Sequence, residues 1–252
     1  MLFLYFSGTG NTKYCIEYFA KGLGDEQAIY SIEQPEAIEQ IRVHKDIVLA
    51  YPIYYSALPK ILRDYIQEHS ELWAGKNIFL IATMGLFSGD GSGVAARPLK
   101  KYGANIVGGL HLTMPDCILD VKALKKTKEK DRWLVQQARK KMDKAIALYQ
   151  SKQYPKEGVH WWNQLAGLFG QRLYFYNKTR HYTDKLKIDA EKCIGCGRCA
   201  ADCPMKNISM MGQKAVSHDK CTMCYRCISN CPKKAITLIG KEVVAEPFNE
   251  YT

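Results

Sequence analysis

The sequence predicts an α/β protein: a doubly wound, parallel sheet of five strands, followed by a small α+β domain rich in cysteine. Two observations support this prediction. Over residues 1–114, short apolar runs alternate with segments whose apolar residues recur at helical spacing. Eight of the ten cysteines then fall between Cys193 and Cys231. Strands that alternate with helices form a parallel sheet with helices on both faces.

Five apolar runs are the expected strands. Most of them are apolar throughout rather than at every second position, which is the pattern of a strand buried on both faces. They cover residues 2–6, 28–32, 46–51, 77–83 and 106–114.

Four further segments carry helical patterns. In one of them, Leu58, Leu62 and Tyr65 lie on a single helical stripe. Ser56 stands where the N-cap of that helix is expected, because a serine side chain can accept from the free N–H groups of the first turn. The expected helices cover residues 12–21, 56–67, 91–102 and 130–149.

Composition excludes several classes of protein. With 47% hydrophobic and 24% charged residues and a net charge of +11, the chain resembles an ordinary globular protein. No apolar run approaches the roughly 18 residues of a membrane span, and the apolar start, MLFLYF, is too short for a signal peptide. We therefore expect a cytoplasmic protein without a membrane span, whose clustered cysteines bind metal rather than form disulfides.

The chain divides into three expected parts: residues 1–150, 151–185 and 186–252. The middle part is a predicted helical linker dense in aromatic residues, among them Trp161 and Phe169. It is interpreted as a helix packed on the first domain, or as a bridge that holds the third part at a fixed distance. An aromatic platform for nucleic acid is a third interpretation. No nucleic-acid motif accompanies it, and we predict no nucleic-acid partner.

The third part contains the spacing C-x2-C-x2-C-x3-C-P twice, from Cys193 to Pro204 and from Cys221 to Pro232. This is the spacing with which bacterial ferredoxins bind iron–sulfur clusters. Structural zinc is the alternative, but zinc sites favour paired C-x2-4-C motifs or mixtures of Cys and His. No His lies within either motif. The spacing therefore favours two [4Fe–4S] clusters.

The ligands of the two clusters are expected to cross. In two-cluster proteins with this spacing, the fourth cysteine of each motif ligates the other cluster. This part of the chain resembles the bacterial-type two-cluster ferredoxins, which implies one-electron transfer. Cys15 and Cys117 lie elsewhere and are expected to be inert, buried thiols. The two predicted ligand sets are Cys193, Cys196, Cys199 and Cys231, and Cys221, Cys224, Cys227 and Cys203.

A polar loop follows the first expected strand and leads directly into a helix. Such a loop binds anions, because backbone N–H groups and the helix dipole favour phosphate. The P-loop pattern is absent, and Lys13 occupies the third glycine position of the dinucleotide pattern G-x-G-x-x-G. A loop for the phosphate of a mononucleotide fits best. Its expected residues are Ser7, Gly8, Thr9, Gly10, Asn11 and Thr12.

Two further loops follow the strands expected at residues 46–51 and 77–83. An open parallel sheet binds its ligands at the carboxyl ends of strands. Aromatic side chains there can stack on a flat ring, although core packing is the alternative for Tyr54, Tyr55 and Phe87. The residues predicted to flank a ring are Pro52, Ile53, Tyr54, Tyr55, Thr83, Met84, Gly85, Leu86, Phe87, Ser88 and Gly89.

The S-G-T-G-N-T motif, the Y-P-I-Y-Y loop and the later glycine-rich loop together resemble a flavodoxin over residues 1 to about 150. The resemblance implies a flavodoxin-like fold that binds FMN, with residues 7–12 at the phosphate and the other two loops at the isoalloxazine ring. Some flavodoxins carry acidic loops around the flavin. This sequence differs from them, because only Asp90 is acidic in its flavin loops. The whole chain is similar to the flavodoxin–ferredoxin fusion proteins of anaerobes.

These cofactors imply electron transfer within one chain between two [4Fe–4S] clusters and FMN, which couples one-electron and two-electron carriers. The expected partner is a redox protein such as a ferredoxin or a reductase. Basic residues around Lys206, Lys233 and Lys234 are expected to attract an acidic partner, and exchange that does not depend on salt would contradict this.

The alternative function is an FMN-dependent reductase of a small acceptor, such as a quinone, a nitro compound or free flavin. An open pocket at the ring would favour the reductase, whereas a ring covered by Tyr54, Phe87 or a helix over residues 161–177 would favour the carrier. The flavin loops contain no acid–base pair that would protonate a substrate, which favours the carrier. A redox-sensing regulator is a third possibility, without a DNA-binding motif to support it.

Overall fold

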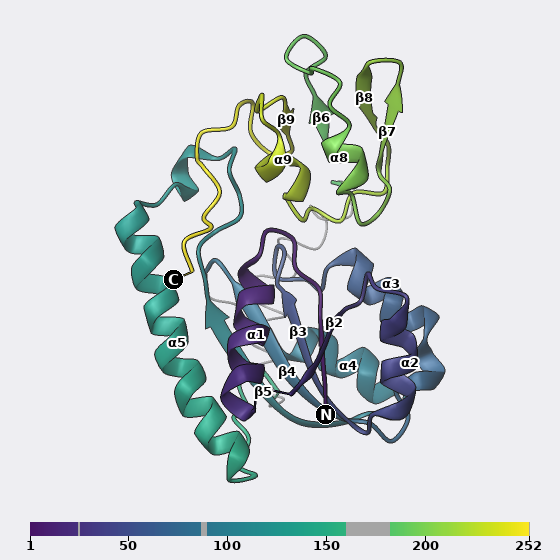
Figure 1. Cartoon of the computed structure of the whole chain (residues 1–252), viewed down its shortest axis with the longest axis vertical. Coiled ribbons are helices and arrows are strands. Elements are labelled where there is room, and N and C mark those ends of the chain that lie inside the picture. Colours follow the sequence, from purple (N-terminus) through teal and green to yellow (C-terminus); the bar gives the residue numbers. More distant parts are fainter. Residues whose placement is uncertain (25, 87–89, 160–181, 252) are drawn as a thin grey trace.

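The computed structural model describes residues 1–24, 26–86, 90–159 and 182–251 (Figure 1). The expected aromatic helix over residues 161–177 lies outside the described residues, as do Phe87, Ser88 and Gly89. Within the described ranges, no helix is both long and apolar enough to cross a membrane.

A five-stranded parallel sheet in the order β2-β1-β3-β4-β5 forms the centre of the first domain. The order reverses at β1, between β2 on one side and β3 on the other, and ligands of such sheets bind at this switch point. The strands confirm the five predicted runs: β1 (Leu2–Tyr5), β2 (Ala28–Ser31), β3 (Asp46–Pro52), β4 (Asn77–Met84) and β5 (Asn105–Thr113).

Helices cover both faces of this sheet, which confirms the doubly wound prediction (Figure 1). Four of them match the predicted segments. The fifth, α2, is not predicted, because it has eight residues and buries only Ala37 and Ile41, too few for a clear helical pattern. The helices are α1 (Asn11–Leu23), α2 (Glu36–Val43), α3 (Lys60–Glu68), α4 (Gly93–Lys101) and α5 (Lys128–Gln150), with 3₁₀ turns at Ser70–Leu72 and Lys122–Leu124.

The prediction that Ser56 caps a helix is wrong. Helix α3 begins at Lys60, directly after Pro59, so Ser56 is not its N-cap. In its first turn, the Ile61 N–H donates to the Thr222 hydroxyl at 3.3 Å. Tyr55 and Ser56 instead have positive φ angles of 50° and 59°. Backbone hydrogen bonds between Tyr54 and Ala57 in both directions close a tight turn around them. The loop after β3 is therefore a fixed turn at the carboxyl edge rather than the first turn of a helix.

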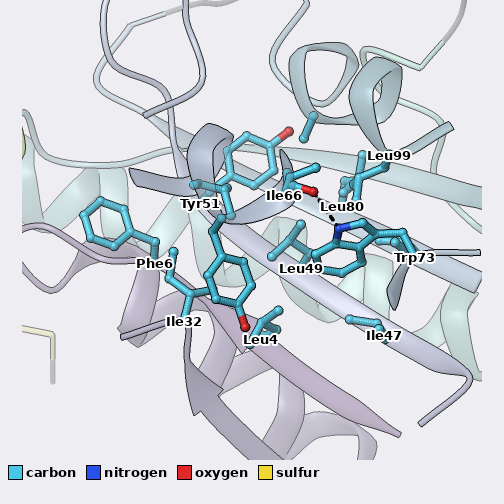
Figure 2. Close-up of a cluster of buried hydrophobic side chains, with 14 of the residues drawn as sticks. Leu4, Phe6, Ile32, Ile47, Leu49, Tyr51, Ile66, Trp73, Leu80 and Leu99 are labelled. Atoms are coloured by element: carbon cyan, nitrogen blue, oxygen red, sulfur yellow. Dashed lines mark hydrogen bonds between the residues drawn. The ribbon is translucent and has the colours of Figure 1, made fainter. Parts of the chain in front are cut away.

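Apolar side chains from alternate strand positions build a core on each face of the sheet. On one face, Leu4, Leu49 and Leu80 pack against α2, α3 and α4. Figure 2 shows this cluster, in which the indole N–H of Trp73 donates to the carbonyl of Ile66 at 3.0 Å. The other face packs against α1 and α5. Burial of each strand on both faces explains why the strand runs are apolar throughout.

The cysteine-rich domain contains two short antiparallel pairs and two short helices. The strand pairs are β6 (Lys187–Ile188) with β9 (Ile236–Thr237), and β7 (Ile208–Met211) with β8 (Lys214–Ser217). Helices α8 (Arg198–Ala201) and α9 (Arg226–Asn230) lie within the first and second cysteine motifs. Each motif thus leads through a helical turn to a strand. Figure 1 shows the domain beyond one end of the sheet.

A buried carboxylate joins the two domains. Asp120, which follows β5, is 4% exposed. Its Oδ2 accepts the backbone N–H groups of Leu238, Ile239 and Gly240 at 2.7, 2.9 and 3.1 Å. Its Oδ1 accepts the hydroxyl of Tyr225 at 2.9 Å. Gly240 approaches so closely that an added Cβ would lie 1.6 Å from the carbonyl oxygen of Asp120. One side chain therefore satisfies four donors of the cysteine-rich domain.

We expect Asp120→Asn to destabilise the protein by about 2–4 kcal/mol, because an amide leaves buried N–H groups without a charged acceptor. For a chain of this length, this corresponds to a fall of roughly 10 °C in the midpoint of thermal unfolding of the anaerobic holoprotein. Tyr225→Phe is the matched control, since it removes one of the four hydrogen bonds and should cost about 1 kcal/mol. A D120N protein no less stable than Y225F would contradict this role for Asp120.

Candidate functional site

A cavity of about 300 Å³ lies at the carboxyl edge of the sheet. The loops after β1, β3, β4 and β5 all contribute to it, and so does the second cysteine motif. Of the residues predicted to bind a mononucleotide, those lining the cavity are Ser7, Gly8, Thr9, Asn11, Thr12, Pro52, Ile53, Tyr54, Tyr55, Thr83, Met84, Gly85 and Leu86. The fold thus brings three separate sequence motifs to one hollow.

The loop over residues 7–12 is held in place by its own side chains. The Ser7 hydroxyl accepts the backbone N–H of Gly10 at 3.2 Å. Gly10 has a φ of 108°, a conformation that favours glycine, and α1 begins at the next residue. Thr12 shares a 2.8 Å hydrogen bond with Thr83 of β4. This loop therefore presents a helix N-terminus to the cavity, as an anion site requires.

The last residues of the chain return to this loop. The Tyr251 hydroxyl donates to the Asn11 Oδ1 at 3.0 Å, and its ring stacks on Tyr14 of α1 with centroids 4.8 Å apart. The Asn11 amide nitrogen donates in turn to the Pro115 carbonyl at 2.8 Å. Arg139 of α5 donates to the Tyr251 carbonyl. The C-terminal segment thus fixes the Asn11 side chain from outside the domain that carries it.

The tyrosines of the β3 loop are neutral walls of the cavity. Tyr54 is 8% exposed, and burial raises the pKa of its hydroxyl. Burial also raises the pKa of Tyr55, whose ring stacks on Tyr182 at 6.1 Å between centroids. Tyr54 belongs to the hydrophobic core and lines the cavity as well, so the two interpretations of this residue are compatible.

The carboxyl end of β5 adds residues that the sequence analysis did not select. Met114, Pro115, Asp116, Cys117 and Ile118 all line the cavity. Their signal in the sequence was their position after a predicted strand, at the same edge as the other loops. Cys15 is buried, as expected. Cys117, by contrast, is partly exposed and lies at the cavity, although burial raises the pKa of its thiol.

Asp90, the acidic residue of the predicted loops, is not among the residues that line the cavity. It is 4% exposed and pairs with Arg97 of α4 at 2.9 Å. The acid that lines the cavity is Asp116. Burial raises the pKa of its carboxyl, against the opposing effects of the Ile118 backbone N–H and Lys126. The sequence predicts no acid–base pair in the flavin loops, and Asp116 adds an acid to the site from outside those loops.

Two small cavities lie within the cysteine-rich domain, and each is lined by four cysteines. In each cavity, three cysteines come from one motif and the fourth comes from the other. The cysteines of one cavity are Cys193, Cys196, Cys199 and Cys231, and those of the other are Cys203, Cys221, Cys224 and Cys227. The two groups contain the same cysteines as the two predicted ligand sets.

Backbone N–H groups point at the sulfur atoms, as thiolate ligands require. Asn207 donates to Cys203 at 3.2 Å, Met223 to Cys221 at 3.3 Å and Ala235 to Cys231 at 3.3 Å. Such hydrogen bonds stabilise coordinated sulfur and influence the potential of a cluster. The donor set of each cavity, four thiols and several N–H groups, suits an iron–sulfur cluster.

The two cysteine groups differ in their exposure. In the first motif Cys196 is exposed, and backbone N–H groups of Ala215 and Gly195 lower the pKa of Cys193. In the second motif Cys224 is buried, and burial raises its pKa to about 12. Burial likewise raises the pKa of Cys221 to about 11. Metal binding would offset this penalty, because ligating thiols lose their protons.

The second cysteine motif forms part of the wall of the mononucleotide cavity. Met223 and Tyr225 line that cavity directly. Gly8 lies so close that an added Cβ would be 2.4 Å from the Cys224 carbonyl oxygen and 2.4 Å from the Tyr54 hydroxyl. The group of four cysteines around Cys224 is therefore adjacent to the mononucleotide cavity.

Arg226, between Cys224 and Cys227, holds the loop over residues 7–12. Its guanidinium donates to the backbone carbonyls of Ser7 at 2.7 Å and Gly8 at 3.2 Å. It also forms two hydrogen bonds with the Glu33 carboxylate, at 2.7 and 2.8 Å. The Glu33 carboxylate holds the pKa of Arg226 above its ordinary value. One planar side chain thus joins the second cysteine motif to the loops after β1 and β2.

Comparison with known proteins identifies both domains. The flavodoxin domain family matches residues 2–170, and the 4Fe-4S dicluster domain family matches residues 185–232. No curated protein matches the chain.

Solved structures similar to this chain include several flavodoxins. Two-electron reduced flavodoxin from Megasphaera elsdenii shares 21% identity over 46% of this chain and 89% of that one, with a TM-score of 0.42. Oxidised flavodoxin 2 from Bacillus cereus shares 17% identity over 60% of this chain and 97% of that one, with a TM-score of 0.44.

The flavodoxin match covers more than half of the chain, and the fold agrees with it. The two matched domains imply FMN and iron–sulfur as cofactors and electron transfer as their joint activity. The chain belongs to the flavodoxin domain family and continues into a 4Fe-4S dicluster domain, so that it is a flavodoxin–ferredoxin fusion.

Proposed function

We propose that the protein transfers electrons within one chain, from a first [4Fe–4S] cluster through a second cluster to FMN, or in the reverse direction. The observation that carries this proposal is the contact between the second cysteine motif and the mononucleotide cavity through Met223 and Tyr225. Because both cofactor sites share a wall, transfer between them requires no encounter between molecules.

The polar loop and the aromatic residues of the cavity suit the two ends of FMN. The N-terminus of α1 with Thr9 and Thr12 would hold the phosphate. Tyr54 and Tyr55 would form an apolar wall for the ring, with Gly85 allowing the backbone to approach its edge. Bound FMN would supply one-electron and two-electron redox chemistry. The residues of the chain would position it, exclude water and keep the second cluster close.

The positions of the two cysteine groups define the proposed order of the clusters. The cluster of Cys203, Cys221, Cys224 and Cys227 would lie beside the flavin. The cluster of Cys193, Cys196, Cys199 and Cys231 would lie farther out, where Cys196 and Ile194 are exposed.

We assign residues 1–150 to the flavin unit and residues 186–252 to the cluster unit, with residues 151–185 as the linker.

The proposed partner is a redox protein that docks beside the outer cluster. Ile194 is 58% exposed there and offers an apolar contact. Lys206, Lys233 and Lys234 are exposed, as steering of an acidic partner requires, although Lys234 pairs with Glu246.

The reductase of a small acceptor stays as a second candidate function, because one observation favours it. Asp116 places a carboxyl group at the cavity, and a reductase needs a proton donor near the site of hydride transfer. Of the features expected to cover the ring, Tyr54 lines the cavity, whereas Phe87 and residues 161–177 lie outside the described part of the chain. Turnover of a quinone or a nitro compound without a protein partner would favour this candidate.

We expect Arg226→Lys to weaken FMN binding by about tenfold, because a lysine cannot hold both loop carbonyls and the Glu33 carboxylate at once. The measurement is a fluorescence titration of FMN into flavin-free protein whose clusters are intact. Glu33→Gln is the control, since it leaves the bonds to the Ser7 and Gly8 carbonyls in place and should have a smaller effect. Unchanged affinity in R226K would show that the loop does not depend on Arg226.

The crossed ligand sets predict which cysteine variants behave alike. C196A and C231A should lose the same cluster signal in electron paramagnetic resonance, although they lie in different motifs. C224A and C203A should lose the other signal. In each variant, iron should fall from about eight to about four atoms per chain. If C231A instead lost the signal that C224A loses, each motif would hold its own cluster. Zinc in the anaerobically purified protein would contradict the clusters altogether.

The proposed order predicts that C196A slows reduction of FMN by a reduced, acidic ferredoxin, because electrons would enter at the outer cluster. Anaerobic stopped-flow absorbance measures this rate. Reduction of FMN by excess dithionite is the control and should continue in the variant. The wild-type rate should also fall as salt is added, since salt screens the basic surface. An equal rate in C196A would place the entry point elsewhere.

A further inference from the structure

Asp116 occupies a position that electron transfer alone does not explain. It follows β5, its Oδ1 accepts the backbone N–H of Ile118 at 2.9 Å, and its carboxyl lines the flavin cavity. Its Oδ2 lies against the β4 loop, since a Cβ added to Gly85 would be 2.8 Å from it. The carboxyl therefore lies next to the backbone that is proposed to flank the flavin ring.

Asp116 also lines a second, polar cavity of about 510 Å³. The segment after β5, the start of α5 and the C-terminal segment enclose it. Asp116, Ile118 and Leu124 line both cavities, so these side chains separate the flavin site from the polar cavity. The charged residues that line the polar cavity are Asp116, Lys125, Lys126, Lys128, Asp131, Lys234, Glu246 and Glu250.

Charged groups of both signs face Asp116. Lys126 donates to the Gly85 carbonyl at 3.2 Å and favours the ionised carboxyl, as do the N–H groups of Cys117 and Ile118. Burial and, to a lesser extent, the Asp116 carboxyl raise the pKa of Asp131 of α5, and the buried Oδ1 of Asp131 has no hydrogen-bond partner among the described residues. Burial outweighs the favourable groups and raises the pKa of Asp116. The carboxyl is thus easier to protonate than one in water.

We propose that Asp116 takes up a proton from the side of the polar cavity when the flavin pocket gains electrons, and releases it when the electrons leave. The inference rests on the proposed function, because it requires FMN in the cavity. Two electrons that arrive from the clusters add negative charge beside Asp116, and this charge favours its neutral form. The proton comes from water in the polar cavity, so that electrons come from the clusters and protons come from solvent. The same carboxyl would serve as the proton donor if a small acceptor is reduced.

The test is the number of protons taken up per electron pair in wild type and in Asp116→Asn. The amide keeps an acceptor for the Ile118 N–H but cannot ionise. Protons are counted with an indicator dye during anaerobic reduction in weak buffer, at a series of pH values. At pH values between the oxidised-state and reduced-state pKa of the carboxyl, wild type should take up as much as about one proton more per electron pair than D116N. Outside this window the carboxyl has the same charge in both states, and the difference should vanish.

Asp219→Asn, an exposed change of the same chemistry in the cysteine-rich domain, is the matched control and should behave as wild type. Equal proton uptake in wild type and D116N at every pH would overturn the proposal. Infrared difference spectra of wild type with ¹³C-labelled aspartate give a readout that does not need the variant to fold. A protonated carboxyl band on reduction is expected, and its absence would also overturn the proposal.

The outcomes separate this inference from the function on which it rests. A protein that binds FMN and reduces it through the clusters, with no protonation at Asp116, would overturn the role of Asp116 alone. A protein that binds no FMN would overturn the proposed function, and this inference with it.

Discussion

The contact between the loop over residues 7–12 and the second cysteine motif determines how the two domains face each other. Arg226 holds the carbonyls of Ser7 and Gly8, and Gly8 leaves no space for a side chain against Cys224 and Tyr54. These are contacts to backbone atoms, so the domains cannot slide past each other without losing them. The distance between the two cofactor sites is therefore set by the fold and not by the length of a linker.

The rest of the interface supports this arrangement through groups that neither domain can satisfy alone. Asp120 would be a buried carboxylate without partners if the segment after β9 moved away, which is costly. The cysteine-rich domain has only a small core of its own. Such a domain gains much of its folding free energy from bound iron–sulfur, and the flavodoxin domain supplies a surface against which it packs. Leu119 belongs to that small core although it comes from the first domain.

The sequence allowed prediction of the features that depend on local pattern. The strands are recognisable because each is apolar throughout, and the cysteine spacing is specific enough to predict which cysteines line each small cavity. The start of α3 could not be placed, because the turn at Tyr55 depends on the bonds between Tyr54 and Ala57. Asp116 follows a predicted strand and so lies at the predicted edge of the sheet, but only the tertiary structure shows that its carboxyl lies beside Gly85 of the β4 loop. The bond from Arg226 to Gly8 joins residues 218 positions apart, and no local pattern indicates it.

Arg226 also has a thermodynamic consequence for the holoprotein. It lies between two cysteines of the inner group and touches the loop at which phosphate would bind, so the conformation of each site affects the other. If assembly of the inner cluster orders Arg226 and thereby the loop, it increases the affinity for FMN by some factor. Binding of FMN must then favour assembly of that cluster by the same factor, because coupling between two sites is reciprocal. A chain that holds only one of its cofactors is then less populated than it would be if the sites were independent. The coupling thus favours molecules in which the electron path is complete.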